Sequence, residues 1–342
     1  MNVGILTHPQ AINYGGILQC YALSVCLEKM GHKAIVIRRG ANTPCWRLIA
    51  TKVIDSLGMR RFIHSRVIDK STNINFFSEK YLYRTYPLLS QKAMRRVCEQ
   101  YQLDAVIVGS DQVWRADFAL SFGYNYFLDF VPANVKKISF AASFGLSTWD
   151  YTPEQTRRIK DLLADYRGIS VREEEAISLC KDYLGLDVMQ MPDPTLLLSA
   201  ADYVKVTSPR LVKGKYVFVY WLGDKTLVEA DAEIYRNQGY EVVFVGLREQ
   251  IVLPKVEDWL SYLMYADKVL TDSFHGCVFS IIFKKELHVF SNVSGGNGRV
   301  VSLFKQFGFD GTSVYEKDYG NSSSIFKSLQ ERAIEFLNHS LR

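Results

Sequence analysis

The chain has 342 residues, of which 48% are hydrophobic and 23% are charged. These values are near those of ordinary globular proteins, and they exclude intrinsic disorder, a collagen-like repeat and a disulfide-rich miniprotein. The length predicts roughly two domains. A formal net charge of +5 is compatible with an anionic substrate but is too small to indicate binding of nucleic acid.

The cysteines and the N-terminus indicate the compartment. The six cysteines form no CxxC pair, and several lie inside apolar runs, which favours buried, reduced thiols. Residues 1–7 lack the charged and long apolar regions of a signal peptide. No stretch reaches the roughly 20 apolar residues of a membrane span. We therefore expect a soluble, cytoplasmic protein, and its oligomeric state stays open, a homo-oligomer included.

The first part of the chain predicts a parallel sheet. Residues 3–7 and 33–38 have the pattern of buried strands, and residues 17–30 between them have the pattern of a helix. A strand, a glycine-containing loop, a helix and a second strand make a βαβ unit, which places the strands in parallel. Further apolar strands are predicted at residues 105–108 and 138–142.

Residues 44–100 differ in character, because bulky apolar residues alternate with basic ones at helical spacing. The favoured interpretation is an inserted helical pair that packs on the sheet. The alternative is a surface that lies near an anionic glycan or a lipid-linked acceptor, in peripheral contact with the inner face of the membrane.

The rest of the chain repeats the alternation of strands and helices. Pro192 and Pro194 cannot lie inside a helix or a central strand, and we place a domain boundary there. The elements predicted around it are strands at 168–171, 216–222, 241–245, 267–271 and 287–290, with helices at 153–166, 173–184, 227–237, 259–265, 276–283 and 324–341. Alternation in both halves predicts two doubly wound, Rossmann-like α/β domains, residues 1–195 and 196–342. The second domain includes the C-terminal helix, and the active site is expected in the cleft between the domains.

Ligands of such sheets bind beyond the carboxyl ends of the strands, often where a helix begins. Asn13, Tyr14, Gly15 and Gly16 lie in such a position, and the glycines let a ligand approach the backbone. The alternative is a tight turn with a helix cap. The segment is not a GxGxxG fingerprint, so a dinucleotide is disfavoured.

Two further strand ends carry polar residues. Asp111 follows the strand at 105–108, together with Gln112 and Trp114, and could act as a base or bind a hydroxyl. Its alternative role is a helix cap. Arg172, at another strand–helix junction, is suited to bidentate binding of a carboxylate or phosphate. Its alternative role is a structural salt bridge.

The strongest candidate is His275, at the start of the predicted helix 276–283, where free backbone amides favour an anion. Ser273 adds a donor, and Gly276 leaves the approach path open. Arg299 lies in a glycine-rich loop that could close over an anion. For each of these a purely structural role is the alternative. The sequence has no HExxH or paired-aspartate motif, so no metal and no cofactor are expected.

Several of these segments, taken in order, resemble the polysaccharide pyruvyl transferase family. The matching segments are Asn-Tyr-Gly-Gly-Ile-Leu-Gln-Cys-Tyr-Ala-Leu at 13–23, Val-Gly-Ser-Asp-Gln-Val-Trp at 108–114, Ser-Val-Arg-Glu at 170–173, Pro-Asp-Pro-Thr-Leu-Leu-Leu at 192–198 and Thr-Asp-Ser-Phe-His-Gly at 271–276. The resemblance covers residues 3–310. It implies a GT-B-like fold and transfer of a pyruvyl group from phosphoenolpyruvate to sugar hydroxyls of bacterial surface polysaccharides, such as capsule or exopolysaccharide.

The resemblance also implies roles for individual residues. His275 matches a proposed catalytic histidine, Arg172 matches an arginine that holds the donor, and Asp111 matches a catalytic acid more loosely. Known members carry Arg-Leu-His where this chain has Ser-Phe-His, so Ser273 replaces an arginine. We predict Arg299 as the substitute. The first domain is expected to hold the acceptor, a glycan or a lipid-linked oligosaccharide, and the second domain the donor.

Three other functions stay open. The first is a GT-B glycosyltransferase that uses a nucleotide sugar, and the second is transfer of a different anionic group to a glycan. The third is a non-catalytic glycan-binding protein, which would bind without releasing phosphate.

Overall fold

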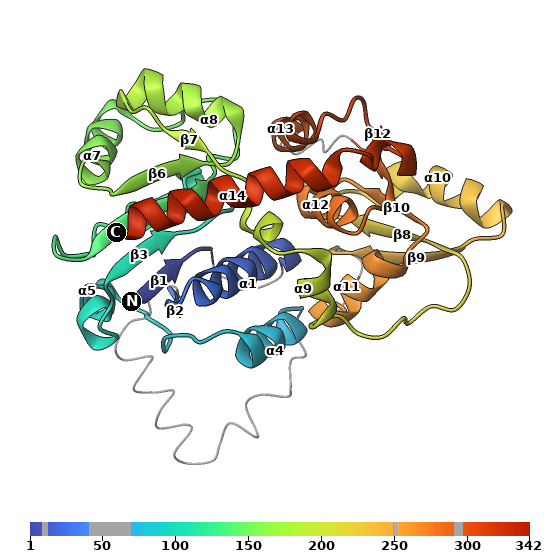
Figure 1. Ribbon diagram of the computed structural model, residues 1–342, viewed down its shortest axis with the longest axis horizontal. Coiled ribbons are helices and arrows are strands. Elements are labelled where there is room, and N and C mark those ends of the chain that lie inside the picture. Colours follow the sequence, from blue (N-terminus) through green and yellow to red (C-terminus); the bar gives the residue numbers. More distant parts are fainter. Residues whose placement is uncertain (9–12, 41–69, 249, 251, 291–296) are drawn as a thin grey trace, which may run out of the picture.

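The computed structural model describes residues 1–8, 13–40, 70–248, 250, 252–290 and 297–342. Two sheets lie side by side along its long axis (Figure 1). In the first sheet the strand order is β2-β1-β3-β5-β6-β7, and neighbouring strands pair in parallel. Its strands are β1 (Asn2–Leu6), β2 (Lys33–Ile37), β3 (Ala105–Val108), β5 (Lys136–Ala142), β6 (Gly168–Val171) and β7 (Met189–Gln190). A further short strand is β4 (Ser121–Tyr124).

The second sheet has the order β12-β11-β10-β8-β9. Its strands are β8 (Tyr216–Trp221), β9 (Glu241–Gly246), β10 (Lys268–Thr271), β11 (Glu286–Val289) and β12 (Ser313–Val314). All pairs are parallel except β11 with β12. Strands such as β3 and β8 are buried throughout, as expected for parallel strands with both faces covered. The prediction of an α/β fold with two parallel sheets is confirmed.

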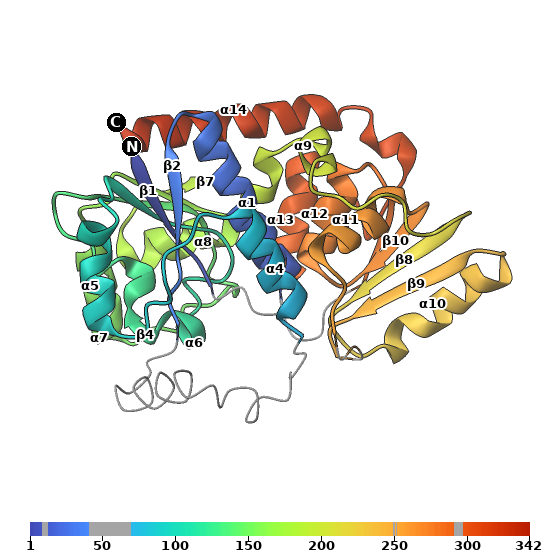
Figure 2. The same ribbon diagram turned by 90° about the horizontal axis from the view of Figure 1, so that it is seen from below.

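Helices cover both sheets (Figure 2). They are α1 (Tyr14–Lys29), α4 (Thr72–Tyr81), α5 (Gln91–Gln100), α6 (Ala116–Ala119), α7 (Pro153–Leu163), α8 (Glu174–Leu179), α9 (Ala200–Val204), α10 (Thr226–Asn237), α11 (Val256–Tyr265), α12 (Phe274–Ile282), α13 (Asn297–Phe307) and α14 (Ser322–Leu341). Short 3-10 segments are η1 (Asn125–Phe127), η3 (Pro194–Leu197) and η4 (Glu316–Tyr319), and α8 continues into a π-helical turn, η2 (Cys180–Leu184).

The predicted boundary at residue 195 lies between β7, the last strand of the first sheet in the chain, and β8, the first strand of the second. Of the predicted insert 44–100, residues 44–69 lie outside the described residues, and the remainder contains α4 and α5. The C-terminal helix α14 runs along both halves (Figure 2), and Phe336 contacts Phe140 of β5. Lys136 Nζ donates to the carbonyl oxygen of Leu341 at the end of that helix.

Two predicted elements differ from the structure. Helix α1 begins at Tyr14 rather than at residue 17, because Asn13 caps it: Oδ1 accepts from the N–H of Gly16 at 3.0 Å. The glycine-rich segment with Arg299 was predicted as a loop, but Arg299 lies in the first turn of α13. Residues 295 and 296 of that segment lie outside the described residues.

Candidate active site

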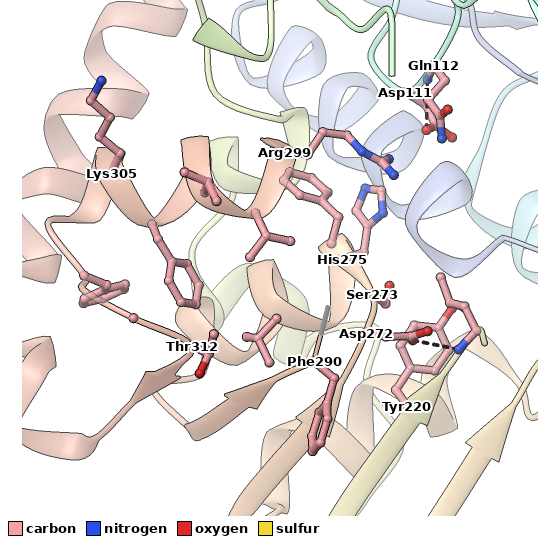
Figure 3. Close-up of a pocket in the computed structure, with 18 of the residues that line it drawn as sticks. Asp111, Gln112, Tyr220, Asp272, Ser273, His275, Phe290, Arg299, Lys305 and Thr312 are labelled. Atoms are coloured by element: carbon pink, nitrogen blue, oxygen red, sulfur yellow. Dashed lines mark hydrogen bonds between the residues drawn. The ribbon is translucent and has the colours of Figure 1, made fainter. Parts of the chain in front are cut away.

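A cavity of about 670 Å³ lies where the carboxyl ends of the two sheets meet. Asn13, Asp111 and Gln112 line it from the first half, and Figure 3 shows Asp111 and Gln112. The second half contributes the ends of β8, β9, β10 and β11 together with α13 and the segment 308–312. This is the position in which doubly wound sheets bind their ligands. The cavity lies between the halves of the protein, where the sequence predicts the active site.

His275 lies in the first turn of α12, which begins just after the end of strand β10. Ser273 caps the helix, with Oγ accepting from the N–H of Gly276 at 3.4 Å, and its own N–H donates to Thr271 Oγ1 at 3.0 Å. Thr271 Oγ1 in turn donates to the carbonyl oxygen of Tyr220 on β8, at 2.7 Å. Because these bonds tie the end of β10 to β8, the helix start holds the imidazole at a fixed place on the cavity wall.

The imidazole is 6% exposed and is held from two sides. A Cβ on Gly15 of α1 would lie 1.9 Å from His275 Nδ1, so the glycine leaves room for the ring. His275 Nε2 lies 3.6 Å from Asp193 Oδ2, which suits an ion pair but is too long for a hydrogen bond. Nε2 is buried and has no hydrogen-bond partner among the described residues.

Asp193 belongs to a buried polar cluster behind the imidazole. Its Oδ2 accepts from Arg172 Nη1 at 2.9 Å and from Ser110 Oγ at 3.0 Å. Its Oδ1 accepts from the N–H of Thr195 at 3.0 Å and from Thr195 Oγ1 at 2.7 Å. Burial raises the pKa of this carboxyl, but the contact with His275, the charge of Arg172 and the hydrogen bond from Thr195 outweigh burial and hold the pKa far below its usual range. Asp193 is therefore an ionised group that lies beside His275.

Arg172 is placed differently from its predicted role. It is 3% exposed and is not among the residues that line the cavity. Its Nε donates to Glu173 Oε1 at 2.9 Å, so two carboxylates already hold its charge. Burial by itself lowers the pKa of this guanidinium. The negative charges of Glu173, Asp193 and Asp111 outweigh burial, so the pKa is raised above its usual value. The geometry shows the structural salt bridge, which was the alternative interpretation of Arg172. Arg172 supports the site from outside the cavity, through its ion pairs with Glu173 and Asp193.

The buried cluster leads to a prediction for Asp193→Asn. At pH 7 this change is expected to lower the free energy of unfolding by up to about 3–5 kcal/mol, because Arg172 loses one of its buried partners. The folded protein holds the pKa of Asp193 below the unfolded value of 3.8, so the stabilisation is complete above that pH and is lost as the pH falls. Urea unfolding should therefore separate wild type from variant most at pH 7 and less at pH 3. A larger difference in the free energy of unfolding between wild type and variant at pH 3 than at pH 7 would contradict the role of Asp193.

Asp111 follows β3 in a left-handed backbone conformation with φ of 76°, which is costly for a residue other than glycine. Its carbonyl oxygen accepts from the N–H of Ser143 at 3.1 Å, which fixes it beside β5. Asn13 Nδ2 donates to Oδ2 at 3.1 Å, and the N–H of Gln112 donates to Oδ1 at 3.0 Å. Burial raises the pKa of Asp111, but nearby cations, Arg172 foremost, lower it overall. Asp111 is thus ionised and can accept a hydrogen bond from a hydroxyl.

Arg299 points from α13 toward His275, with Asp111 beyond (Figure 3). Its guanidinium carbon lies 6.0 Å from the centroid of the Phe274 ring. Nε has no hydrogen-bond partner among the described residues. Burial and the positive charge of Arg172 lower the pKa of this guanidinium, so a bound anion would relieve an unfavourable environment. Arg299, His275 and Asp111 thus meet at one end of the cavity.

Other predicted residues take structural positions. Tyr14 and Trp114 were predicted in the cleft, which is wrong, because both are fully buried. Tyr14 stacks on Trp259 at 5.0 Å and donates to the carbonyl oxygen of Pro254, which joins the two halves. Trp114 Nε1 donates to the carbonyl oxygen of Tyr126 inside the first half.

The structure also gives Gly276 and Gly16 roles other than the predicted one of leaving room for a ligand. A Cβ on Gly276 would lie 2.4 Å from Thr271 Oγ1, so this glycine serves packing and not the approach of a ligand. Gly16 mainly supplies the N–H that Asn13 caps. Among the residues missed by sequence reasoning, Asp272 accepts from the N–H of Leu222 at 2.8 Å and shapes the cavity wall.

The chain matches the family model described as polysaccharide pyruvyl transferase over residues 13–294. The chain belongs to the polysaccharide pyruvyl transferase family. Membership makes it a transferase, and the resemblance inferred from the motifs is confirmed. A comparison with curated protein sequences finds no match.

Solved structures show the same architecture. One is a UDP-GlcNAc 2-epimerase from Neisseria meningitidis bound to UDP-GlcNAc, with 12% identity, coverage of 100% of this chain and 99% of that chain, and a TM-score of 0.53. Another is MnaA of S. aureus with UDP, with 15% identity, coverage of 99% and 91%, and a TM-score of 0.50. Both are GT-B proteins, and the predicted fold of this family member, two Rossmann-like domains, is thereby confirmed.

Neither a membrane span nor a metal cluster is found in the described ranges. No helix there is long and apolar enough to cross a bilayer, and no three His, Cys, Asp or Glu side chains gather as metal ligands. Cys45 lies outside those ranges, and the other cysteines are buried.

Proposed function

We propose that this family member transfers a pyruvyl group from phosphoenolpyruvate to sugar hydroxyls of a glycan or lipid-linked oligosaccharide, a precursor of a bacterial surface polysaccharide. The observation that carries the proposal is the convergence of Arg299 and His275 at one end of the cavity (Figure 3). A guanidinium with an unpartnered Nε suits the carboxylate or phosphate of the donor. The backbone amides at the start of α12 add to this attraction.

In the proposed reaction, protonated His275 gives its proton to the methylene carbon of the donor, which becomes a methyl group. The oxygen of one sugar hydroxyl attacks the neighbouring carbon, and its proton passes to Asp111. A second hydroxyl then attacks the same carbon, the bond to the phosphate oxygen breaks, and the phosphate leaves with that hydroxyl's proton. The products are a cyclic ketal and phosphate, and the proton on Asp111 restores His275 through solvent.

The first half is proposed to bind the acceptor. Asn13 and Gln112 line the cavity beside Asp111, and Asn13 Nδ2 holds its carboxylate toward the space where a hydroxyl would lie. Because Asp111 is a weak base with a low pKa, it accepts the proton only as the hydroxyl oxygen loses electrons to the new bond. The reaction would take place in the cytoplasm, near the inner face of the membrane if the acceptor is lipid-linked.

The test is release of phosphate from phosphoenolpyruvate in the presence of galactose- and mannose-type acceptors. The proposal expects release that depends on the acceptor, with one ketal formed for each phosphate. Binding of a glycan without phosphate release would favour a non-catalytic glycan-binding protein. Release with another anionic donor but not with phosphoenolpyruvate would favour transfer of a different group.

A second candidate is a GT-B glycosyltransferase that uses a nucleotide sugar. The observation in its favour is the size of the cavity, which extends from His275 along Phe290, Val300 and Phe304 and exceeds what a three-carbon donor fills. Apolar walls with few polar groups are typical of sites for larger ligands. A rise in the melting temperature with UDP or GDP, and none with phosphoenolpyruvate, would favour this candidate.

Arg299→Gln tests the donor end of the cavity. The change is expected to raise the Kd for phosphoenolpyruvate about tenfold to a hundredfold, because a hydrogen bond between charged groups contributes roughly 1.5–3 kcal/mol. Calorimetric titration measures it. The control is Lys305→Gln on the same helix, since Lys305 lines the cavity but pairs with Glu174. Equal Kd values for Arg299→Gln and wild type would remove Arg299 from the donor site.

A further inference from the structure

Helix α13 carries Arg299 into the cavity, so the placement of this helix decides where the guanidinium lies (Figure 3). By its place in the chain α13 belongs to the second half. Ser302 follows Arg299 by three residues, which puts the two side chains at neighbouring positions on the surface of the helix. Ser302 is 5% exposed. The contacts of this buried serine therefore bear directly on the position of Arg299.

Ser302 ties α13 to the first half of the protein. Its Oγ accepts from Gln190 Nε2 at 2.9 Å and from the N–H of Glu174 at 3.4 Å. Gln190 lies on β7 and Glu174 begins α8, so both donors come from the first half. The same Nε2 of Gln190 donates to the carbonyl oxygen of Arg172 at 3.0 Å. One side-chain amide thus connects the backbone of Arg172 to the helix that carries Arg299.

An ion pair at the surface joins the same two helices. Lys305 Nζ lies 2.9 Å from Glu174 Oε1 and 2.6 Å from Oε2, and the two side chains are 68% and 53% exposed. An exposed pair of this kind contributes little. The bonds of Ser302 are expected to matter more, because their loss leaves a buried or half-buried donor without its partner. Ser302 is therefore the stronger of the two anchors.

Arg299 needs such an anchor because a second cation lies close by. The guanidinium carbons of Arg172 and Arg299 lie 4.5 Å and 6.0 Å from the centroid of the same ring, that of Phe274. Burial, and after it the charge of Arg172, lower the pKa of Arg299. Repulsion between the two cations favours movement of Arg299 away from the cavity as long as no anion is bound. The bonds between α13 and the first half oppose that movement.

We propose that Ser302 is a positioning residue, whose bonds to Gln190 and Glu174 hold α13 against the first half so that Arg299 meets the anionic group of the donor. A binding group that is held in place before the ligand arrives costs less to order on binding. The inference rests on the proposed function for the identity of the donor. It adds that the donor end of the cavity is assembled from both halves, although Arg299 itself belongs to the second.

Calorimetric titration of the full chain with phosphoenolpyruvate tests the inference without requiring turnover. Ser302→Ala is expected to raise the Kd about threefold to tenfold, the effect of losing a hydrogen bond that holds the binding group. Ser302→Thr keeps a hydroxyl and should bind the donor more tightly than Ser302→Ala. In the Arg299→Gln background, Ser302→Ala should change the Kd less than about twofold, because no guanidinium is left to misplace.

The matched control is Ser322→Ala. Ser322 is also 5% exposed, and its Oγ donates to the carbonyl oxygen of Tyr319 at 2.7 Å within the second half. This change removes a buried hydroxyl of the same kind without touching α13, so the Kd should stay at the wild-type value. Circular dichroism and the melting temperature check that every variant is folded at the temperature of the titration.

Two results would overturn the inference while the proposed function stands. One is an equal Kd for wild type and Ser302→Ala. The other is the same loss of affinity from Ser302→Ala with and without Arg299, which would show that Ser302 acts on the cavity by another route.

Titration with inorganic phosphate separates the inference from the proposed function. If inorganic phosphate binds with this dependence on Arg299 and Ser302 and phosphoenolpyruvate does not bind, Ser302 keeps its positioning role and the proposed donor is wrong. If Arg299→Gln binds both anions as tightly as wild type does, Arg299 holds no anion and the inference is overturned.

Discussion

His275→Asn is expected to lower kcat about 10²- to 10⁴-fold with phosphoenolpyruvate and an acceptor sugar. This is the usual effect of losing a group that transfers a proton in the transition state. The fold should survive, because Asp193 keeps its bonds to Arg172, Ser110 and Thr195 when the imidazole is removed. Steady-state kinetics measure the change in kcat, and calorimetry measures the Kd of the donor, which should change far less.

The matched control is His339→Asn, which removes an imidazole from the exposed side of α14. It should leave kcat and the melting temperature at their wild-type values. A His275→Asn enzyme that keeps kcat within about threefold of wild type would show that another group carries the proton. A similar melting temperature in all three proteins is needed to exclude loss of the fold as the cause.

Gly15→Ala is expected to lower kcat about a hundredfold, although the added methyl group touches no substrate. Its Cβ would lie 1.9 Å from His275 Nδ1 and 2.1 Å from Cγ, so the ring must move by an ångström or more. A misplacement of this size costs about 10²-fold in rate. Gly15 does not have a positive φ, so the helix itself accepts alanine without backbone strain.

Two comparisons isolate this effect. Gly320→Ala places a methyl group with its nearest neighbour, the carbonyl oxygen of Lys317, at 4.0 Å and should change nothing. If Gly15 acts only through the imidazole, the double variant with His275→Asn should be no slower than His275→Asn alone. A further loss of rate in the double variant would mean that Gly15 contacts the ligand or holds the halves together.

Local patterns in the sequence predicted most of the sheets. The strand predicted at residues 105–108 has the bounds of β3, because a run of apolar β-branched residues between polar loops suits a buried parallel strand. Glycines were the main source of error. At the starts of α1 and α13 they indicate a loop by propensity, whereas both segments are helical in the structure and Asn13 caps α1.

The candidate site was predictable only in part. His275, Asp111 and Arg299 were selected because each follows a strand end, and the structure brings all three to one cavity. The role of Arg172 depends on Asp193, which is distant in the sequence, and no local pattern reveals such a pairing. The burial of Tyr14 depends on Trp259 from the other half, a tertiary contact that a single sequence does not encode in its spacing.

The path of α14 along both halves has a consequence for how the protein unfolds. This helix packs against η3 and α13 on one side and reaches β6 of the first sheet on the other, and one apolar cluster continues through both halves. Neither half can lose its structure without exposing apolar surface of the other, so denaturation should proceed as a single cooperative event. A ligand held between the halves would then protect the whole polypeptide against heat and proteases, rather than one portion of it.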